Sequence, residues 1–287
     1  MTPWLFTLML WARPPGDTYF SVVLEGGCGE VCEGAKYSSF YEGFVRQETL
    51  EEGRERYRTL ARAEERAIEK VLCVTLAGVK IEGCVPEPVA LDKKTKKLLF
   101  GPVFAVAALN GVAIPESGLR EDVQAGRGFA KKCPKDGPSS IAGVCGPSDD
   151  GGMGRGPGGE ACVVQIHPSI GWRFADGDPE VLARAEAGDK RAQEAIMQSL
   201  VGLDEASTER CFRAGLRMLL HSFGYCEWWR RQNATAVNYD YAMYSLYGTG
   251  TSCVSPNSGK TVYRAELFRK LYARAKLLAK QARGGES

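Results

Sequence analysis

Apolar residues recur along this chain mainly with the period of an α-helix. Thr49 and Glu52 form a capping box, and the apolar positions after them return at helical spacing up to Leu72. From Leu98 the chain is apolar on every side, which predicts a helix buried in the core. Asp178, directly before a proline, predicts the start of another helix. The predicted helices cover residues 49–72, 98–114, 179–200, 208–223 and 262–282.

The pattern divides the chain into three parts. Strand-like alternation is too short to build more than a small hairpin, so the predicted fold class is mainly α. Residues 1–16 resemble the core of a signal peptide, although the segment is short and lacks a basic leader. Residues 17–97 are predicted to be an N-terminal extension that carries the amphipathic helix, and residues 98–283 the main helical domain. Within that domain, the polar, Gly- and Pro-rich residues 119–159 predict a loop over a cleft, because structureless loops beyond ~15 residues are usually functional or disordered.

Charge and hydropathy exclude two classes of partner. The 37 basic and 35 acidic residues are dispersed and give a net charge of +2, so we expect no nucleic-acid partner. No apolar stretch reaches the ~18 residues of a membrane-spanning helix, so we expect no stable membrane span.

Ten cysteines are many for 287 residues, and their spacing does not fit a zinc finger or zinc ribbon. We therefore expect at least two disulfides and an extracytoplasmic location in the periplasm, outside the cell or on a virus particle. Buried free thiols in a cytosolic protein are the alternative. Three pairs are close enough in sequence to close short loops: Cys28 with Cys32, Cys73 with Cys84, and Cys133 with Cys145, the last within the long polar loop.

The apolar helix runs into Pro115, Glu116, Ser117 and Gly118, which places one carboxyl between a dry helix and a long polar loop. Burial disfavours the charged form of a carboxyl, and a glycosidase needs one carboxyl that stays protonated near neutral pH. On these residues alone, a glutamate without a function at a helix end is the more common interpretation.

Three later segments strengthen the catalytic interpretation because they follow in order. Residues 159–168, GEACVVQIHP, resemble a segment of goose-type lysozymes and soluble lytic transglycosylases that reads roughly Gly-Leu-Met-Gln-Ile-x-Pro, with Gln165 and Ile166 on its Gln-Ile. Residues 212–224, FRAGLRMLLHSFG, are similar to the Ala-Gly helix of that family. Residues 241–250, YAMYSLYGTG, resemble its Ala-Leu-Ala-Ala-Tyr-Asn-Ala-Gly element, with Tyr247 on the Tyr and Gly250 on the final Gly.

The resemblance implies a lysozyme-like domain with a sugar-binding groove and Glu116 as the catalytic residue. Ser117 would orient the carboxylate or the sugar, and Gln165 would line the groove with Ile166. Tyr247 would hydrogen-bond near the acid, beside Gly250. The implied partner is a peptidoglycan glycan strand, cut between N-acetylmuramic acid and N-acetylglucosamine to give 1,6-anhydromuropeptides, and the reaction requires neither a metal nor a cofactor.

Two features leave alternatives open. Pro115 stands where the family has a polar residue, and we expect it to end the helix early and place Glu116 on a turn. Gly248 and Thr249 replace the Asn-Ala that follows the family's tyrosine. A hydrolysing lysozyme would need a second carboxyl, for which Glu160 is the first candidate, and a non-catalytic peptidoglycan-binding or structural protein of an envelope or virus particle remains a further alternative.

Overall fold

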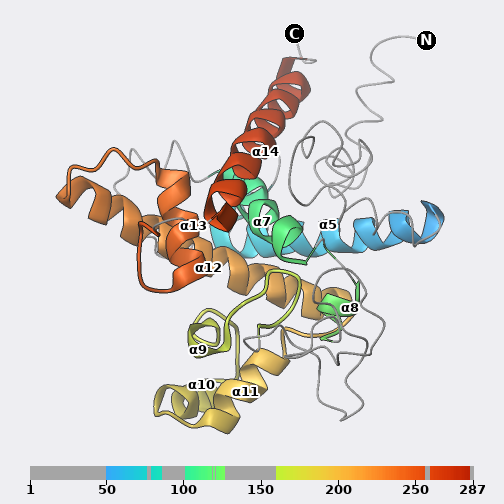
Figure 1. Cartoon of the computed structure of the whole chain (residues 1–287). Helices are drawn as coiled ribbons and strands as arrows, with labels where there is room; N and C mark the ends of the chain where they lie inside the picture. Colours follow the sequence, from blue (N-terminus) through green and yellow to red (C-terminus); the bar gives the residue numbers. More distant parts are fainter. Residues whose placement is uncertain are drawn as a thin grey trace, which may run out of the picture.

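The computed structural model describes residues 50–75, 79–85, 101–117, 119, 121–126, 160–255 and 259–284. These residues are mainly helical, as predicted (Figure 1). Their extended pairing consists of two isolated bridges, Val74 with Lys80 and Ala161 with Ile166. None of the helices described has the length and apolarity that crossing a membrane requires. The helices are α5 (Leu50–Leu72), α7 (Pro102–Ser117), α8 (Glu121–Gln124), α9 (Pro168–Gly171), α10 (Pro179–Glu186), α11 (Lys190–Gln198), α12 (Glu205–Gln232), α13 (Tyr239–Thr249) and α14 (Gly259–Gly284).

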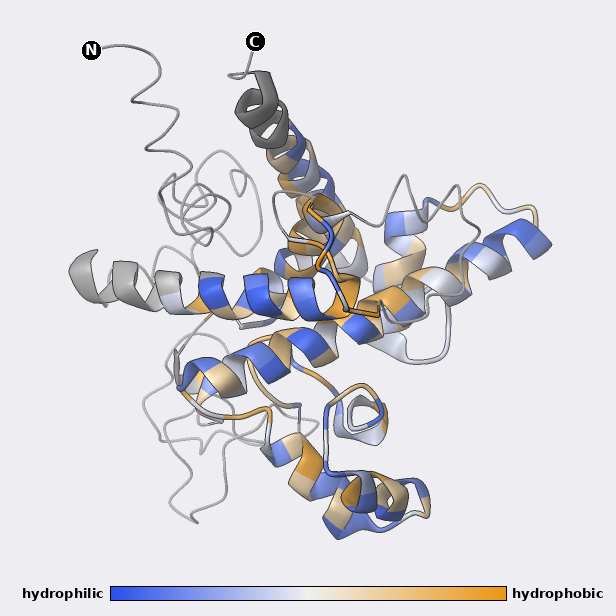
Figure 2. Ribbon diagram, turned by 180° about the vertical axis from the view of Figure 1, so that it is seen from behind, coloured by the Kyte–Doolittle hydropathy of each residue, from blue (hydrophilic) through white to orange (hydrophobic). Residues whose placement is uncertain are grey.

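Helices α5 and α12 cross the molecule side by side (Figures 1 and 2). Seen from behind, α5 turns a mainly hydrophilic side outward (Figure 2), while its apolar residues, which recur at helical spacing, are buried against the core. These buried apolar residues are Leu60, Ala63, Ala67, Ile68 and Val71. The helix predicted in an N-terminal extension therefore shares one core with the helices of the main domain.

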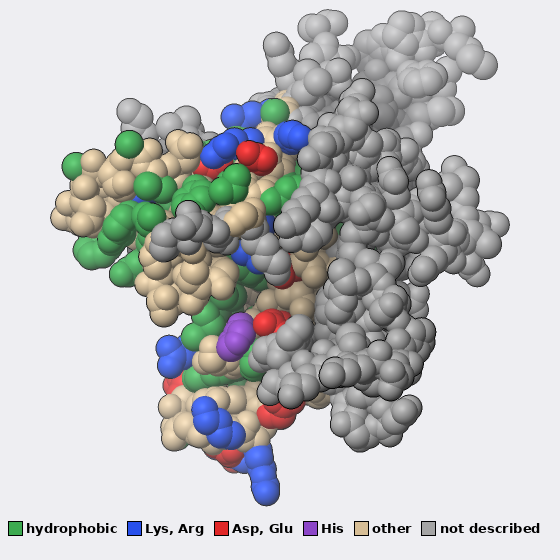
Figure 3. Space-filling model, in the orientation of Figure 1, with side chains coloured by type: hydrophobic (Ala, Val, Ile, Leu, Met, Phe, Trp, Pro, Cys, Tyr) green, Lys and Arg blue, Asp and Glu red, His purple; other side chains and the backbone are tan. Residues whose placement is uncertain are grey.

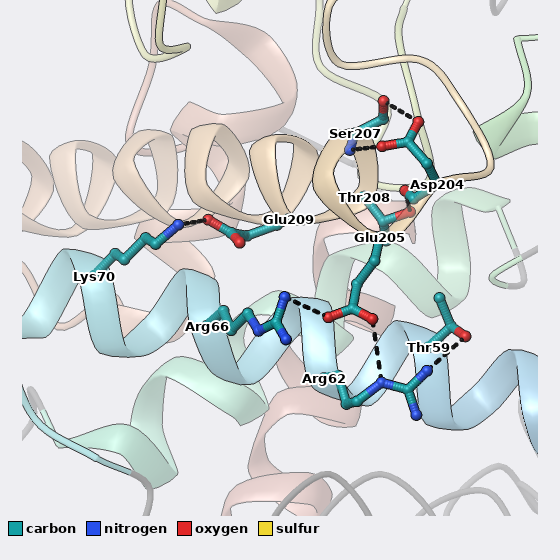
Figure 4. Close-up of polar contacts among 9 residues, drawn as sticks. All are labelled: Thr59, Arg62, Arg66, Lys70, Asp204, Glu205, Ser207, Thr208 and Glu209. Atoms are coloured by element: carbon teal, nitrogen blue, oxygen red, sulfur yellow. Dashed lines mark hydrogen bonds and ion pairs between the residues drawn. The ribbon is translucent and has the colours of Figure 1, made fainter.

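Ion pairs line the seam between α5 and α12 (Figure 4). Arg62 Nε lies 3.2 Å and Arg66 Nη1 2.6 Å from the carboxylate of Glu205, and one turn further along Lys70 pairs with Glu209. The cations recur every four residues on α5, so all three face α12. These three ion pairs form a ladder that joins α5 to α12.

Helix α7 is the central element, because 13 of its 16 residues are buried. It packs antiparallel to α14, whose Phe268 lies 5.3 Å from Phe104 between ring centroids. Phe223 of α12 meets the same ring edge-on at 5.3 Å. The helix continues through Pro115 to Ser117, so the prediction that this proline ends the helix before Glu116 is wrong. Near the C-terminal end of α7, the ring of Pro115 removes one backbone N–H without moving the residue at which the helix ends.

Helix α13 folds back along α12 and closes over α7. Gly111 permits this approach, because a Cβ there would lie 2.2 Å from the Tyr244 hydroxyl. The hydroxyl donates to the Ala108 carbonyl across 3.0 Å, which links α13 to α7.

The predicted helix over residues 179–200 is two helices. Asp178 caps α10 as expected, with its carboxylate accepting from the backbone N–H of Glu180 and Val181. At Gly188 the backbone φ is +94°, a conformation that suits glycine and ends the first helix. Asp189 then caps α11. The sequence carried this second cap, and the single-helix prediction overlooked it.

The prediction of at least two disulfides is confirmed, and one of the pairs close enough in sequence to close a short loop is among them. Cys73 and Cys84 are joined, as are two pairs far apart in sequence, Cys162 with Cys211 and Cys226 with Cys253. The predicted pairs Cys28 with Cys32 and Cys133 with Cys145 lie outside the described residues, as do residues 1–49 and most of the polar loop.

Candidate active site

Glu116 lies one residue before the C-terminal end of α7, at the margin of the core. Its side chain is only 10% exposed, and its carboxylate pairs with the guanidinium of Arg264 from α14, which is 6% exposed. The antiparallel packing of α7 and α14 brings the last turn of one helix to the start of the other. The candidate acid is therefore a nearly buried group in contact with a cation.

Two residues of α13, Tyr247 and Gly248, lie next to the guanidinium of Arg264. Its guanidinium carbon lies 5.9 Å from the centroid of the Tyr247 ring, within the distance of a cation–π contact. A Cβ built on Gly248 would lie 2.6 Å from Arg264 Nη1. Gly248 is one of the two positions that depart from the family pattern, and here its missing side chain leaves the space that the guanidinium fills.

A tight turn, residues 161–166, lies beneath these side chains. The Ala161 and Ile166 backbones exchange hydrogen bonds of 2.9 and 3.0 Å that close the turn. Two of its residues adopt left-handed backbone conformations, Cys162 at φ +58° and Gln165 at φ +54°. Cys162 occupies the register of the family motif's glycine, and glycine is the residue that favours this conformation. The disulfide to Cys211 ties the turn to α12.

The turn meets two further segments that resemble the family. The Tyr247 hydroxyl donates to the Val164 carbonyl across 2.7 Å. Gly215 of α12 lies so close that a Cβ there would be 2.7 Å from Val164 Cγ1. These contacts form a chain from α12 to α7: Gly215 packs on the turn, the turn accepts a hydrogen bond from Tyr247, and the Tyr247 ring lies near Arg264, the partner of Glu116.

The remaining predicted site residues take mostly structural positions. Ser117 is fully buried; its hydroxyl donates to the Ala113 carbonyl at 2.8 Å and accepts from the Leu119 N–H at 3.0 Å. Ile166 is buried in the core, and Gly250 ends α13 at φ +69°. Glu160 is half-buried at the start of the turn segment.

Gln165 lies on the turn with its side chain folded back. Its Nε2 donates to the Cys162 carbonyl across 2.7 Å, which supports the turn it belongs to. His167, which follows two residues later, caps α9 through a ring nitrogen that accepts from the Ser169 N–H. Both polar side chains stabilise local backbone in this structure.

Two residues of the site gave no signal in the sequence. Arg264 falls inside a predicted helix among other basic residues, and only packing singles it out. Gln124 is buried and joins three segments: it donates to the carbonyls of Leu200 and Gly202 and accepts from the Val163 N–H. Both act through contacts with residues more than 38 positions away.

The part of the chain that the structure describes contains no cluster of three His, Cys, Asp or Glu side chains that could hold a metal ion. On the face drawn in Figure 3, lysine and arginine side chains are interspersed with aspartate and glutamate. The aromatic residues Tyr225 and Trp228 lie together on α12, 45% and 54% exposed. No family model, curated protein or solved structure matches this chain.

Proposed function

We propose that the protein cleaves peptidoglycan glycan strands as a lytic transglycosylase, with Glu116 as both acid and base. One observation carries the proposal: the four segments that resemble the family are linked by direct contacts, which reach Glu116 through Arg264. Tyr247 reaches the turn through its hydroxyl, and Gly215 packs on the same turn. The left-handed backbone at Cys162, in the register of the motif's glycine, supports the same alignment.

One carboxyl suffices for the proposed reaction. Protonated Glu116 donates to the oxygen between N-acetylmuramic acid and N-acetylglucosamine, and the bond from that oxygen to the muramic C1 breaks. The carboxylate then takes the proton of the muramic C6 hydroxyl, whose oxygen bonds to C1 and closes the 1,6-anhydro ring. Glu116 returns to its protonated form, and no water is consumed.

The ion pair with Arg264 favours a second candidate, a non-catalytic protein that binds glycan strands. A guanidinium in contact with a carboxylate stabilises the charged form, whereas the first step of catalysis needs the neutral acid. A binding protein of an envelope or a virus particle has no such requirement.

Product analysis separates the candidates. The full chain is incubated with purified peptidoglycan sacculi, and released muropeptides are identified by mass spectrometry. We expect 1,6-anhydromuropeptides from the wild type and none from Glu116→Gln, because an amide can neither donate nor accept the proton. Retention of Glu116→Gln on the sacculi would show that the substrate contacts persist.

Two other results would redirect the assignment. Products with a reducing muramic acid, together with loss of activity in Glu160→Gln, indicate a hydrolysing lysozyme. Binding of the wild type without any released product indicates the non-catalytic candidate. The disulfides between distant segments favour an oxidising compartment, and we propose an extracytoplasmic location on that basis.

A further inference from the structure

The contact between Glu116 and Arg264 conflicts with the chemistry proposed for Glu116. Both side chains are nearly buried, at 10% and 6% exposure, so solvent screens their attraction poorly. A carboxylate held in this way is charged at neutral pH. The acid step therefore cannot start from this arrangement of the two side chains.

The surroundings of Arg264 are built to hold its guanidinium in this place. Tyr247 of α13 presents its ring 5.9 Å from the guanidinium carbon. Gly248, on the same helix, leaves a space into which a single methyl group would intrude, 2.6 Å from Nη1. Gly248 is the second-to-last residue of α13, and the absence of a side chain there leaves room for the arginine.

We propose that Arg264 is a positioning residue that keeps Glu116 ionised in the free protein, that Gly248 admits its guanidinium, and that glycan binding separates the pair before proton transfer. The inference rests on the proposed function and adds a resting state to it.

Helices α13 and α14 also carry a phenol and a second ion pair. Burial raises the pKa of the Tyr247 phenol far above its ordinary value, so the ring stays neutral at physiological pH. Further along the same two helices, Asp240 of α13 pairs with Arg269 of α14. Arg264 is thus the cation that directly faces Glu116 from α14, and Tyr247 the titratable group that faces the pair from α13.

The charge of Glu116 is measured directly by NMR titration of the full chain labelled with ¹³C at the glutamate carboxyl carbons. The signal is assigned by its absence in Glu116→Gln. In Arg264→Gln we expect the titration midpoint of Glu116 to rise by about 1 to 3 pH units, because the neighbouring positive charge is gone. Arg264→Lys keeps the charge and should leave the midpoint closer to that of the wild type.

Gly248→Ala tests the same contact from the other side. The methyl group meets the flexible end of Arg264, so we expect α13 to stay folded while the guanidinium is displaced and the midpoint of Glu116 rises. In the Arg264→Gln background the alanine should add no further change. Thermal denaturation followed by circular dichroism verifies that each variant is folded. An unchanged midpoint in both folded single variants would overturn the proposal.

Activity assays on the same variants distinguish this inference from the proposed function. If both hold, cleavage by Arg264→Gln and Gly248→Ala persists to higher pH than wild-type cleavage, because the acid stays protonated longer. If the midpoints rise and none of the proteins cleaves sacculi, the ion-pair assignment stands and the catalytic function fails. If the variants cleave with an unshifted pH profile, Arg264 has a merely structural role and the proposal is wrong.

Discussion

Glu64 and Glu116 are two nearly buried carboxyls, and the first contacts a neutral amide whereas the second contacts a cation. Glu64 of α5 is 3% exposed and accepts a hydrogen bond of 2.9 Å from Asn110 Nδ2 of α7. Burial raises its pKa to about 8, with the bond from Asn110 lowering it only in part. Glu116, near the C-terminal end of α7, meets the guanidinium of Arg264 instead. Burial is the larger influence on Glu64, whereas a cation in contact with a carboxyl, as at Glu116, favours the charged form.

The comparison also separates protonation from function. Glu64 is the carboxyl held neutral near pH 7, as an acid catalyst should be, but it lies inside the core between α5 and α7, where no substrate reaches it. Glu116, one residue before the C-terminal end of α7, is 10% exposed and contacts a guanidinium. Under the proposed function, a glycan bound there would meet a carboxyl whose charged form the guanidinium favours.

The largest effect should be on catalysis. Glu116→Gln and Glu64→Gln make the same chemical change at the two carboxyls. In a sacculus-clearing assay, we expect Glu116→Gln to lose at least about 100-fold in rate, the contribution of a general acid and base, and Glu64→Gln to stay within about twofold of wild type. Equal losses in both folded variants would remove the distinction between them.

An intermediate effect should appear in stability against pH. The folded protein keeps the Glu64 proton up to a pKa of about 8, whereas an unfolded chain releases it near 4.5. The native state thus binds more protons between these values, and the free energy of unfolding should fall by up to about 1.4 kcal/mol for each pH unit as the pH rises between them.

Urea denaturation of wild type and Glu64→Gln at a series of pH values measures how the free energy of unfolding depends on pH. The glutamine variant should show a flatter dependence and gain stability over wild type toward pH 8. Glu65, whose pKa is raised to about 7 mainly by burial, is present in both proteins and cancels in the difference. Parallel curves for the two proteins would mean that Glu64 is ionised, or solvated, in the native state.

The smallest effect should come from the ladder between α5 and α12. Arg66 is 56% exposed and Glu205 26%, so their attraction is screened by solvent. A double-mutant cycle of Arg66→Ala and Glu205→Gln should give a coupling of about 0.2 to 1 kcal/mol. It should vanish in ~1 M salt, where the Debye length is ~3 Å. A larger coupling that does not depend on salt would mean that Arg66 and Glu205 behave like the nearly buried pair of Glu116 and Arg264.

The helical architecture was predictable where one local signal decided the structure. Periodicity gave α5 and the buried α7, and the Asp178 cap was also predicted correctly, whereas Thr49 of the predicted capping box lies outside the described residues. The prediction that Pro115 ends its helix failed because it applied the rule for prolines in helix interiors. Pro115 lies only two residues before the end of α7, and the sequence does not show this. Likewise α12 extends beyond both predicted ends, to Glu205 and Gln232. The helix propensity of the residues does not show how far tertiary packing extends a helix.

Contacts between distant segments were beyond sequence analysis. Nothing near Cys162 indicates Cys211 as its partner, 49 residues away. Glu116 could be selected from its surroundings and from the resemblance, but the cation that faces it comes from a helix 148 residues later. The substitution at Gly248 was visible as a departure from the family pattern, and its cause became visible only when Arg264 was placed beside it.

The packing of α5 on α12 has a consequence for the chain during its synthesis. Arg62 and Glu205, which meet across the seam, are 143 residues apart, so the ribosome completes α5 long before its partner exists. The apolar stripe from Leu60 to Val71 is then exposed on a helix that has little to bury it. Expression at a slower rate or with chaperones should raise the soluble yield, and shortened chains that end before α12 should aggregate.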